Sequence, residues 1–532
     1  MKTRLHLAAP LLALLIGATC PAAAQPAPPE QLGHVAFANS CAPDVQTKFE
    51  RAVALLHSFW FREGEKAFRD VLAQDPGCAI ATWGIATVLI GNTFATGPTP
   101  AQAEQAREAI ARGRAIGAKS ERESERERAF IEAVAQYYEP VAGRSHIARI
   151  RSLSDAFESV ARRFPDDDEA QIFSAIYLTA TQDPAEQTFA SALKAAGILE
   201  IQFKKHPGHP GVAHYLIHSY DYPPIAAKGL DAARKYAGLA PSAPHAQHMP
   251  SHIFTRVGAW QDSADSNLRS AAVAKAEKEF GDQLHAMDYM VYAFLQLARD
   301  KDARARVDEA PDVRGPEQLR SVPYAQAAIP ARYAIERGAW KEAAQLQPQP
   351  TRFAFTAALT QFTRALGAAR SGDAVGAQAG ADELARIVES LKTAKDGYWT
   401  VEVEVQRLGA AAWTAWAAGN RQGGLELMQA AANLEDKSEK NAVSPGRLVP
   451  AHELFGDMLM EAGKPAEALV QYELSQVRDP NRYRSLYGAG EAAARAGNRD
   501  KARYYFTRLA ELARSGDPRP ETDKARRYLA AN

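Results

Sequence analysis

The stretch Pro210-Gly-Val-Ala-His214-Tyr-Leu-Ile-His218 is followed, 34 residues later and in register, by Pro244-His245-Ala-Gln-His248-Met-Pro-Ser-His252. His214 aligns with His248, and His218 aligns with His252. Residues four apart lie on the same face of an α-helix, so each copy predicts a helix with two imidazoles one above the other. The chain is therefore expected to consist of repeated helical units that carry histidines at matched positions.

The spacing of these copies is typical of tetratricopeptide repeats (TPR), in which each unit of 34 residues is a helix-turn-helix pair. Alanine-rich segments with apolar residues three and four apart extend from Val45 to Leu529, as expected for helices. The sequence therefore predicts an all-α protein, a right-handed superhelix (α-solenoid) of irregular TPR-type helix pairs. A solenoid of this kind buries its core between successive units and has no single globular centre.

Small residues recur at one position of the predicted units. We expect a small residue, usually glycine, at the tight contact between the two helices of a unit. The intervals between the aligned positions range from 34 to 47 residues, which predicts insertions and a total of eight to eleven helix pairs. The aligned positions are Gly258, Ala298, Gly338, Gly372, Gly419, Gly463 and Gly497.

The N-terminus has the features of a secretory signal peptide. Lys2 and Arg4 precede an apolar run, and Ala22-Ala-Ala24 provides a cleavage site. We therefore expect a periplasmic or secreted protein. Residues 1–24 would be the signal peptide and residues 25–44 an N-terminal extension. An N-terminal TPR-like solenoid with the histidine cluster would cover residues 45–309, and C-terminal TPR-like repeats would cover residues 310–532.

Two cysteines, Cys41 and Cys78, remain once the proposed signal peptide is removed. An even number of cysteines in an oxidising compartment favours pairing. Cys41 lies just before the first predicted helix, and Cys78 starts the equivalent helix one repeat later. We therefore predict a disulfide between them.

The charge balance limits the classes of partner. The chain has 63 basic and 63 acidic residues and no basic block, which argues against nucleic acid or anionic lipid as the main partner. Beyond the signal segment, no apolar run reaches the roughly 18 residues that a membrane helix needs. A protein or peptide partner is the remaining expectation for a repeat superhelix.

Several segments resemble a family of exported bacterial TPR proteins. The resemblance covers most of the mature chain and implies a superhelical scaffold; it implies no particular reaction. The segments are Leu55-Leu-His-Ser-Phe-Trp60, Asp75-Pro-Gly-Cys-Ala79, His214 to Asp221, His245 to Trp260, Leu448 to Asp457 and Asp479-Pro-Asn-Arg-Tyr483.

The first helix of a TPR unit lines the concave groove of the superhelix. Placed at the groove-facing positions of their units, His245, Thr255, Arg256 and Tyr292 are candidates for contacting a bound peptide. His214, His218, His248 and His252 also face the groove, so the primary hypothesis for the chain is an exported scaffold that holds a protein segment there.

The same four histidines form a candidate metal site. Helices packed about 8 to 10 Å apart can converge their imidazoles on one ion with bonds near 2.0 Å. Asp221, His285 and Asp288 could complete or orient such a site. Zinc is the first choice of metal, with copper or nickel as alternatives, because these ions accept imidazole and carboxylate ligands.

Three interpretations of the histidines remain open: metal binding, peptide recognition without metal, and packing alone. A metal with an open coordination position could also support hydrolysis. The sequence contains no Gly-x-Ser-x-Gly elbow, Walker loop or Cys-x-x-Cys pair. An enzyme is therefore the less favoured interpretation.

Overall fold

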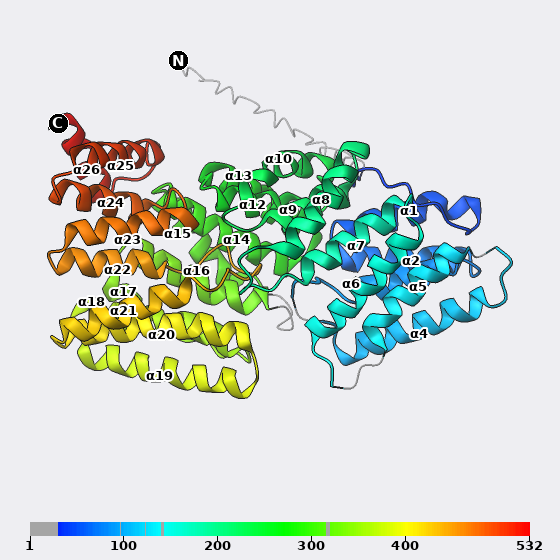
Figure 1. The fold of residues 1–532 in the computed structure, drawn as a ribbon, viewed down its shortest axis with the longest axis horizontal. Helices are drawn as coiled ribbons and strands as arrows, with labels where there is room; N and C mark the ends of the chain where they lie inside the picture. The colour runs from blue at the N-terminus through cyan, green and yellow to red at the C-terminus, as the bar shows by residue number, and fades with distance from the viewer. Residues whose placement is uncertain (1–29, 96, 123, 140–142, 315–319, 532) are drawn as a thin grey trace, which may run out of the picture.

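The computed structural model describes residues 30–95, 97–122, 124–139, 143–314 and 320–531. Within these residues all regular secondary structure is helical, and no strand occurs. The proposed signal peptide, residues 1–24, lies outside the described residues. Figure 1 shows the helices stacked along an elongated body, with the first units at one end and the last at the other.

Seven helix pairs precede residue 310. In the sixth pair the first helix is interrupted at Met249, and the two pieces together pack on α13. The pairs are α1 (Gln46–His57) with α2 (Phe61–Gln74), α3 (Ile80–Val88) with α4 (Pro100–Gly117), α5 (Glu125–Tyr138) with α6 (His146–Arg163), α7 (Asp168–Ala180) with α8 (Ala190–Lys205), α9 (Pro210–Tyr220) with α10 (Leu230–Leu239), α11 (Pro244–His248) and α12 (Pro250–Arg256) with α13 (Trp260–Glu277), and α14 (Phe280–Gln296) with α15 (Asp300–Glu309).

Five further pairs and a closing helix follow. The pairs are α16 (Ser321–Glu336) with α17 (Trp340–Ala344), α18 (Ala354–Ser371) with α19 (Ala374–Thr393), α20 (Gly397–Ala417) with α21 (Arg421–Glu435), α22 (Ala451–Glu461) with α23 (Pro465–Arg478), and α24 (Tyr483–Arg495) with α25 (Arg499–Leu512); α26 (Pro520–Ala531) closes the array. Short 3-10 turns lie at Pro43–Val45, Ala226–Gly229 and Ala310–Asp312. The predicted all-α superhelix of TPR-like pairs is confirmed. The described residues hold twelve pairs, one more than the upper limit expected from the sequence.

The seven aligned small residues have a different role from the one predicted. All seven follow the first helix of a pair and have positive φ angles, so they terminate helices. At Gly463, with φ 73°, an added Cβ would meet no atom within 4 Å. The tight crossing lies seven residues earlier, where a Cβ on Gly456 would come 2.7 Å from the Tyr472 ring of α23. The expectation of a helix crossing at Gly463 was therefore wrong.

The superhelix is wound tightly enough for distant units to touch. Trp260, at the start of α13, donates a hydrogen bond from Nε1 to the carbonyl oxygen of Asn481, 2.7 Å away. Near the other end, Trp60 Nε1 donates to Glu279 Oε1 at 3.2 Å. The picture of a solenoid with contacts only between successive units was therefore incomplete, because its interior is filled by side chains that pair across one turn.

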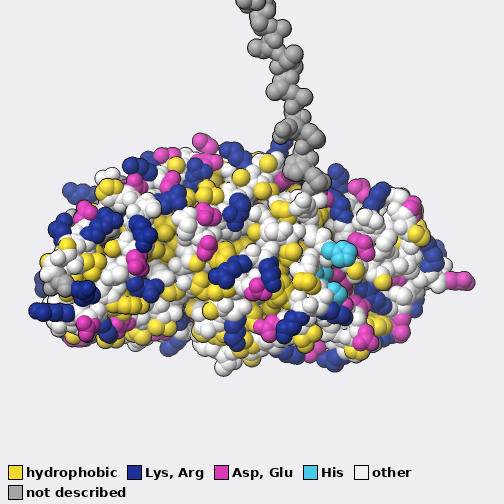
Figure 2. All heavy atoms as spheres, turned by 90° about the horizontal axis from the view of Figure 1, so that it is seen from above, with side chains coloured by type: hydrophobic (Ala, Val, Ile, Leu, Met, Phe, Trp, Pro, Cys, Tyr) yellow, Lys and Arg dark blue, Asp and Glu magenta, His cyan; other side chains and the backbone are white. Residues whose placement is uncertain are grey.

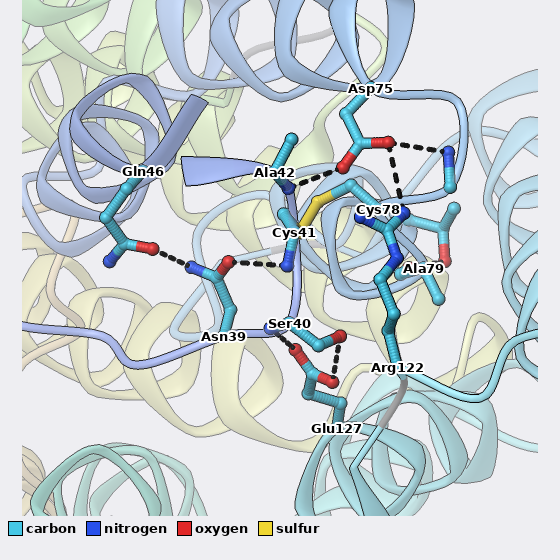
Figure 3. Close-up of a disulfide and its surroundings, with 12 residues drawn as sticks. Asn39, Ser40, Cys41, Ala42, Gln46, Asp75, Cys78, Ala79, Arg122 and Glu127 are labelled. Carbon is cyan, nitrogen blue, oxygen red and sulfur yellow. Dashed lines mark hydrogen bonds and ion pairs between the residues drawn. A yellow bond between two sulfur atoms is a disulfide. The ribbon is translucent and has the colours of Figure 1, made fainter. Parts of the chain in front are cut away.

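The predicted disulfide between Cys41 and Cys78 is present, with the two Cα atoms 4.6 Å apart (Figure 3). Asp75 accepts hydrogen bonds from the backbone N–H groups of Ala42 and Gly77, which fixes the two chain segments beside the bridge. The bridge closes a loop of 37 residues. A loop of that length stabilises the folded state by about 4 kcal/mol in the chain-entropy description.

The surface carries both signs of charge. Figure 2 shows Lys and Arg side chains interspersed with Asp and Glu over the face that it presents, in keeping with the equal numbers of basic and acidic residues. Among the described residues, no helix combines the length and apolar character required to cross a membrane.

Candidate metal centre

Three imidazoles from two adjacent units converge in the interior of the superhelix. His214 and His218 lie on α9, and His245 lies on α11. One nitrogen of each ring lies within 4.8 Å of the other two. The Nε2 atoms of all three rings are buried and have no hydrogen-bond partner. We call these residues the first triad.

The surroundings fix the orientation of the first triad. His214 Nδ1 donates a hydrogen bond to the carbonyl oxygen of His57 at 2.6 Å, so that in the neutral ring Nε2 carries a free lone pair. The Phe59 ring lies edge-on to His214, 4.5 Å away, and the Phe94 ring stacks on His218 at 4.1 Å. These aromatic rings form an apolar wall beside the Nε2 atoms of His214 and His218.

A second group of three imidazoles adjoins the first. It comprises His248 on α11, His252 on α12 and His285 on α14, and one ligand atom of each lies within 4.8 Å of the others. His248 Nε2 and His252 Nε2 are 3.0 Å apart. His252 Nδ1 donates to Asp221 Oδ2 at 2.8 Å. We call these residues the second triad.

The segment between α21 and α22 brings a lysine to the second triad. Lys440 is buried, and its Nζ donates to Asp221 Oδ2 at 3.1 Å. Arg256 donates from Nε to the other oxygen of Asp221 at 2.8 Å and faces Glu439. Asp221 therefore lies between Lys440 and Arg256 beside His252, and Glu439 pairs with both Arg256 and Arg478.

Burial controls the charge of these groups. It lowers the pKa of all six imidazoles of the two triads, so they are neutral at neutral pH, the form that binds metal. Burial alone would raise the pKa of the Asp221 carboxyl, but Lys440, Arg256 and His252 hold it well below its usual value. Burial also lowers the pKa of Lys440 to about 8.

A third cluster, which the sequence analysis did not identify, has all of its hydrogen bonds satisfied. Glu169 on α7 accepts from the Nε2 atoms of His57 and His209, both at 3.0 Å. The hydroxyl group of Tyr215 lies 2.9 Å from His57 Nδ1, and the backbone N–H of Val212 donates to His209 Nδ1. Each ring nitrogen of the two histidines therefore has a partner. We call this cluster the carboxylate-bridged pair.

The structure divides the predicted quartet of His214, His218, His248 and His252 between the two triads. His245, which we expected to contact a peptide, is the third member of the first triad, and His285 is the third member of the second. Asp221 does not join either triad; it accepts the hydrogen bond from His252 Nδ1. Asp288 instead forms a buried ion pair with Arg332 at 2.8 Å.

The remaining predicted groove residues are bonded within the chain. Thr255 Oγ1 lies 2.9 Å from Ser263 Oγ. Tyr292 accepts a hydrogen bond from Arg482 at 2.6 Å, where the next turn of the superhelix packs on α14. Arg256 pairs with Asp221, as described above. At these positions the concave side is occupied by side chains of the protein itself.

Comparisons with known proteins add little to this geometry. No family model matches the sequence, and no curated protein matches it either. Among solved structures, the crystal structure of the APC/C hetero-tetramer Cut9-Hcn1 is similar over 91% of this chain and 76% of that chain, with 11% sequence identity and a TM-score of 0.34.

Proposed function

We propose that this protein binds a metal ion through His214, His218 and His245. The observation that carries the proposal is the convergence of three buried imidazoles, each with one ring nitrogen within 4.8 Å of the others, whose Nε2 atoms have no hydrogen-bond partner. A buried polar atom without a partner costs about 1 to 3 kcal/mol, and one ion would satisfy all three at once. Three imidazoles are a common ligand set for zinc, and copper also accepts them.

The environment favours binding over catalysis. The rings of Phe59 and Phe94 cover His214 and His218, so substrate has no direct approach to the first triad from that side. The backbone carbonyl that holds His214 Nδ1 is the kind of outer partner that orients metal-bound histidines. A metal-binding role is therefore our conclusion, and a metal-dependent hydrolase is the less favoured form of it.

Elemental analysis of purified, tag-free protein tests this proposal directly. We expect zinc or copper in the protein as isolated, and we expect His218→Ala to lose the ion of the first triad while helical content by circular dichroism stays the same. His206→Ala is the matched control, because His206 pairs with Asp168 at the partly exposed end of α8. Protein without bound metal that shows no thermal shift with either ion would refute the proposal.

A second candidate function is a scaffold for a protein partner, which is a common use of repeat superhelices. The observation that favours it is a cavity of about 470 Å³ among the C-terminal units. Arginine and aromatic side chains such as Arg337, Trp340 and Tyr487 line it. These residue types are enriched in protein interfaces. In this second proposal a peptide binds in the cavity, and not at the groove residues expected from the sequence.

A photo-crosslinking residue in place of Tyr487 tests the scaffold hypothesis. We expect it to trap one defined protein in intact cells. The same residue in place of Tyr504, which is 53% exposed on α25, is the control and is expected to trap none. Equal patterns from both positions would contradict binding in the cavity.

An exported location is part of both proposals. The disulfide between Cys41 and Cys78 supports it, because such bridges persist in oxidising compartments. Fractionation of cells that express the full-length chain, followed by thiol labelling of the unreduced protein, tests this point. Free thiols at both cysteines would argue against it.

A further inference from the structure

The second triad contains two facing ring nitrogens that hydrogen bonds within the protein satisfy only in part. The hydroxyl of Tyr289 lies 3.4 Å from His252 Nε2, but it also lies 3.3 Å from the carbonyl oxygen of Ser444, which competes for its one proton. Asn267 donates from Nδ2 to the carbonyl oxygen of Ser263, so its Oδ1 faces His248 and accepts the Nδ1 proton at 2.6 Å. His252 Nδ1 donates its proton to Asp221. In the neutral rings both Nε2 atoms therefore carry lone pairs, and these point at each other across 3.0 Å.

Two facing lone pairs at this distance repel unless a cation lies between them. A tetrahedral ion with bonds of about 2.0 Å holds two ligand nitrogens about 3.3 Å apart, close to the separation seen here. A shared proton could also bridge two nitrogens. It would leave no role for His285, whose ligand atom lies within 4.8 Å of both. The three-membered arrangement therefore favours a metal ion.

The second triad also has the outer partners of a metal site. The carboxylate of Asp221 accepts the hydrogen bond from His252 Nδ1, and the side-chain amide of Asn267 accepts the one from His248 Nδ1. Outer partners of this kind orient imidazole ligands and raise their basicity. The imidazole rings of the two triads are direct neighbours. The ring centroids of His218 and His252 are 6.1 Å apart, and those of His245 and His248 are 6.0 Å apart.

We propose that a second metal ion binds at His248, His252 and His285, so that the protein holds a pair of ions, each on three imidazoles. The proposal rests on the proposed function of the first triad. The ions are of the class that accepts neutral imidazole, with zinc(II) and copper(I) as the two candidates. Arg256 and Lys440 pair with Asp221, the carboxylate beside the second triad, so this carboxylate does not neutralise an ion bound there.

Metal stoichiometry tests the pair. Full-length mature protein without a tag is stripped with a chelator and titrated with zinc(II), and separately with copper(I) under anaerobic conditions. We expect two equivalents of at least one ion in the wild type and one equivalent in His285→Ala. We expect one equivalent in His245→Ala and none in the double variant. His206→Ala should retain two.

The possible outcomes separate this inference from the proposed function. One equivalent in the wild type that is lost only in His245→Ala would overturn the second site and leave the first intact. One equivalent lost in both single variants would mean a single ion shared by the six imidazoles and would also overturn the pair. No bound ion in the wild type would refute both proposals.

Anomalous scattering covers the case in which a variant fails to fold. Crystals of the wild-type protein loaded with zinc(II) or copper(I), measured at the absorption edge of the metal, should show two peaks. One peak should lie among His214, His218 and His245, and the other among His248, His252 and His285. A single peak, or none at the second triad, would overturn the inference without any substitution.

Discussion

The carboxylate-bridged pair and the first triad are in direct contact, because the carbonyl oxygen of His57 accepts the hydrogen bond from His214. Both sets are buried, and each offers three possible metal ligands within 4.8 Å. They differ in their hydrogen bonds. Glu169 and neighbouring groups satisfy every ring nitrogen of His57 and His209, whereas the Nε2 atoms of the first triad have no partner.

This difference shows how to distinguish a structural histidine cluster from a candidate binding site. Burial and proximity are equal in the two sets, so neither property decides. A carboxylate that accepts two imidazole N–H groups completes its own cluster, and an added ion would have to displace those protons. Three buried ring nitrogens without hydrogen-bond partners make an incomplete cluster, which a ligand completes.

The largest effect is expected for Glu169→Ala. Burial raises the pKa of this carboxyl, but His57 and His209 outweigh it and hold the pKa well below its usual value, so the group is ionised. Its removal leaves two buried imidazole N–H groups without their acceptor, and at about 1 to 3 kcal/mol for each it should lower the free energy of unfolding by about 2 to 6 kcal/mol. Urea denaturation should show this loss with and without a chelator.

Glu158→Ala is the control for this substitution. Glu158 lies on the surface of α6 and pairs with Lys194, so its removal should cost about 0 to 1 kcal/mol. The comparison fails if Glu169→Ala abolishes metal binding and leaves stability unchanged, because the carboxylate-bridged pair would then belong to the metal centre.

Metal removal should have the next largest effect. An ion that binds only the folded state, present at 100 times its dissociation constant, stabilises the protein by about 2.7 kcal/mol. A chelator should therefore lower the free energy of unfolding of the wild type by roughly that amount. In a variant that lacks both sites, such as the double substitution of His245 and His285, the chelator should have no effect. An equal response in both proteins would place the metal elsewhere.

The sequence predicts the fold well because the repeat period is a local property. The 34-residue spacing of His214 and His248, together with the small residues that end the first helices, is enough to indicate helix pairs and their order. The disulfide also follows from local position, one repeat apart. The number of pairs was less predictable, because units such as α9 with α10 lack a small residue of positive φ after the first helix.

The membership of the candidate site was harder to predict. Aligning repeats places His248 level with His214, but the ring that lies beside His214 is that of His245, with the two centroids 5.0 Å apart. The pairing of Glu169 with His57 spans 112 residues and leaves no pattern in the sequence. Lys440 comes from a segment between helices, and its position beside Asp221 depends on one whole turn of the superhelix.

Asn267→Leu should have a smaller effect, confined to the second triad. The amide holds the Nδ1 proton of His248, so its removal frees the ring to adopt the other tautomer. Loss of such an outer partner typically lowers metal affinity by 10- to 100-fold, and competition titration should show this for one of the two ions. Ser270→Ala on the same helix, where the hydroxyl bonds the carbonyl oxygen of Pro244, is the control and should leave both affinities unchanged.

The smallest effect concerns His146, which has neither a carboxylate partner nor a place in a triad. Its ring nitrogens contact the hydroxyl of Tyr137 at 2.7 Å and the carbonyl oxygen of Thr93 at 3.3 Å. Burial lowers its pKa to about 4, below the value of about 6.5 for an unfolded chain. Between these values the unfolded state binds more protons, so the free energy of unfolding falls as the pH drops from 6.5 towards 4.

His146→Gln isolates this contribution, because both proteins can be measured in excess chelator, where the triads behave alike. His146 is only partly covered, so we expect it to account for about 1 kcal/mol of the stability lost between pH 7 and pH 5, and the variant should lose that much less. An identical loss in the two proteins would contradict the prediction. The measurement provides a reference for the comparison of the carboxylate-bridged pair with the first triad. It gives the free-energy cost of burying a histidine whose hydrogen-bond partners are neutral, where neither a carboxylate nor a metal ion offsets that cost.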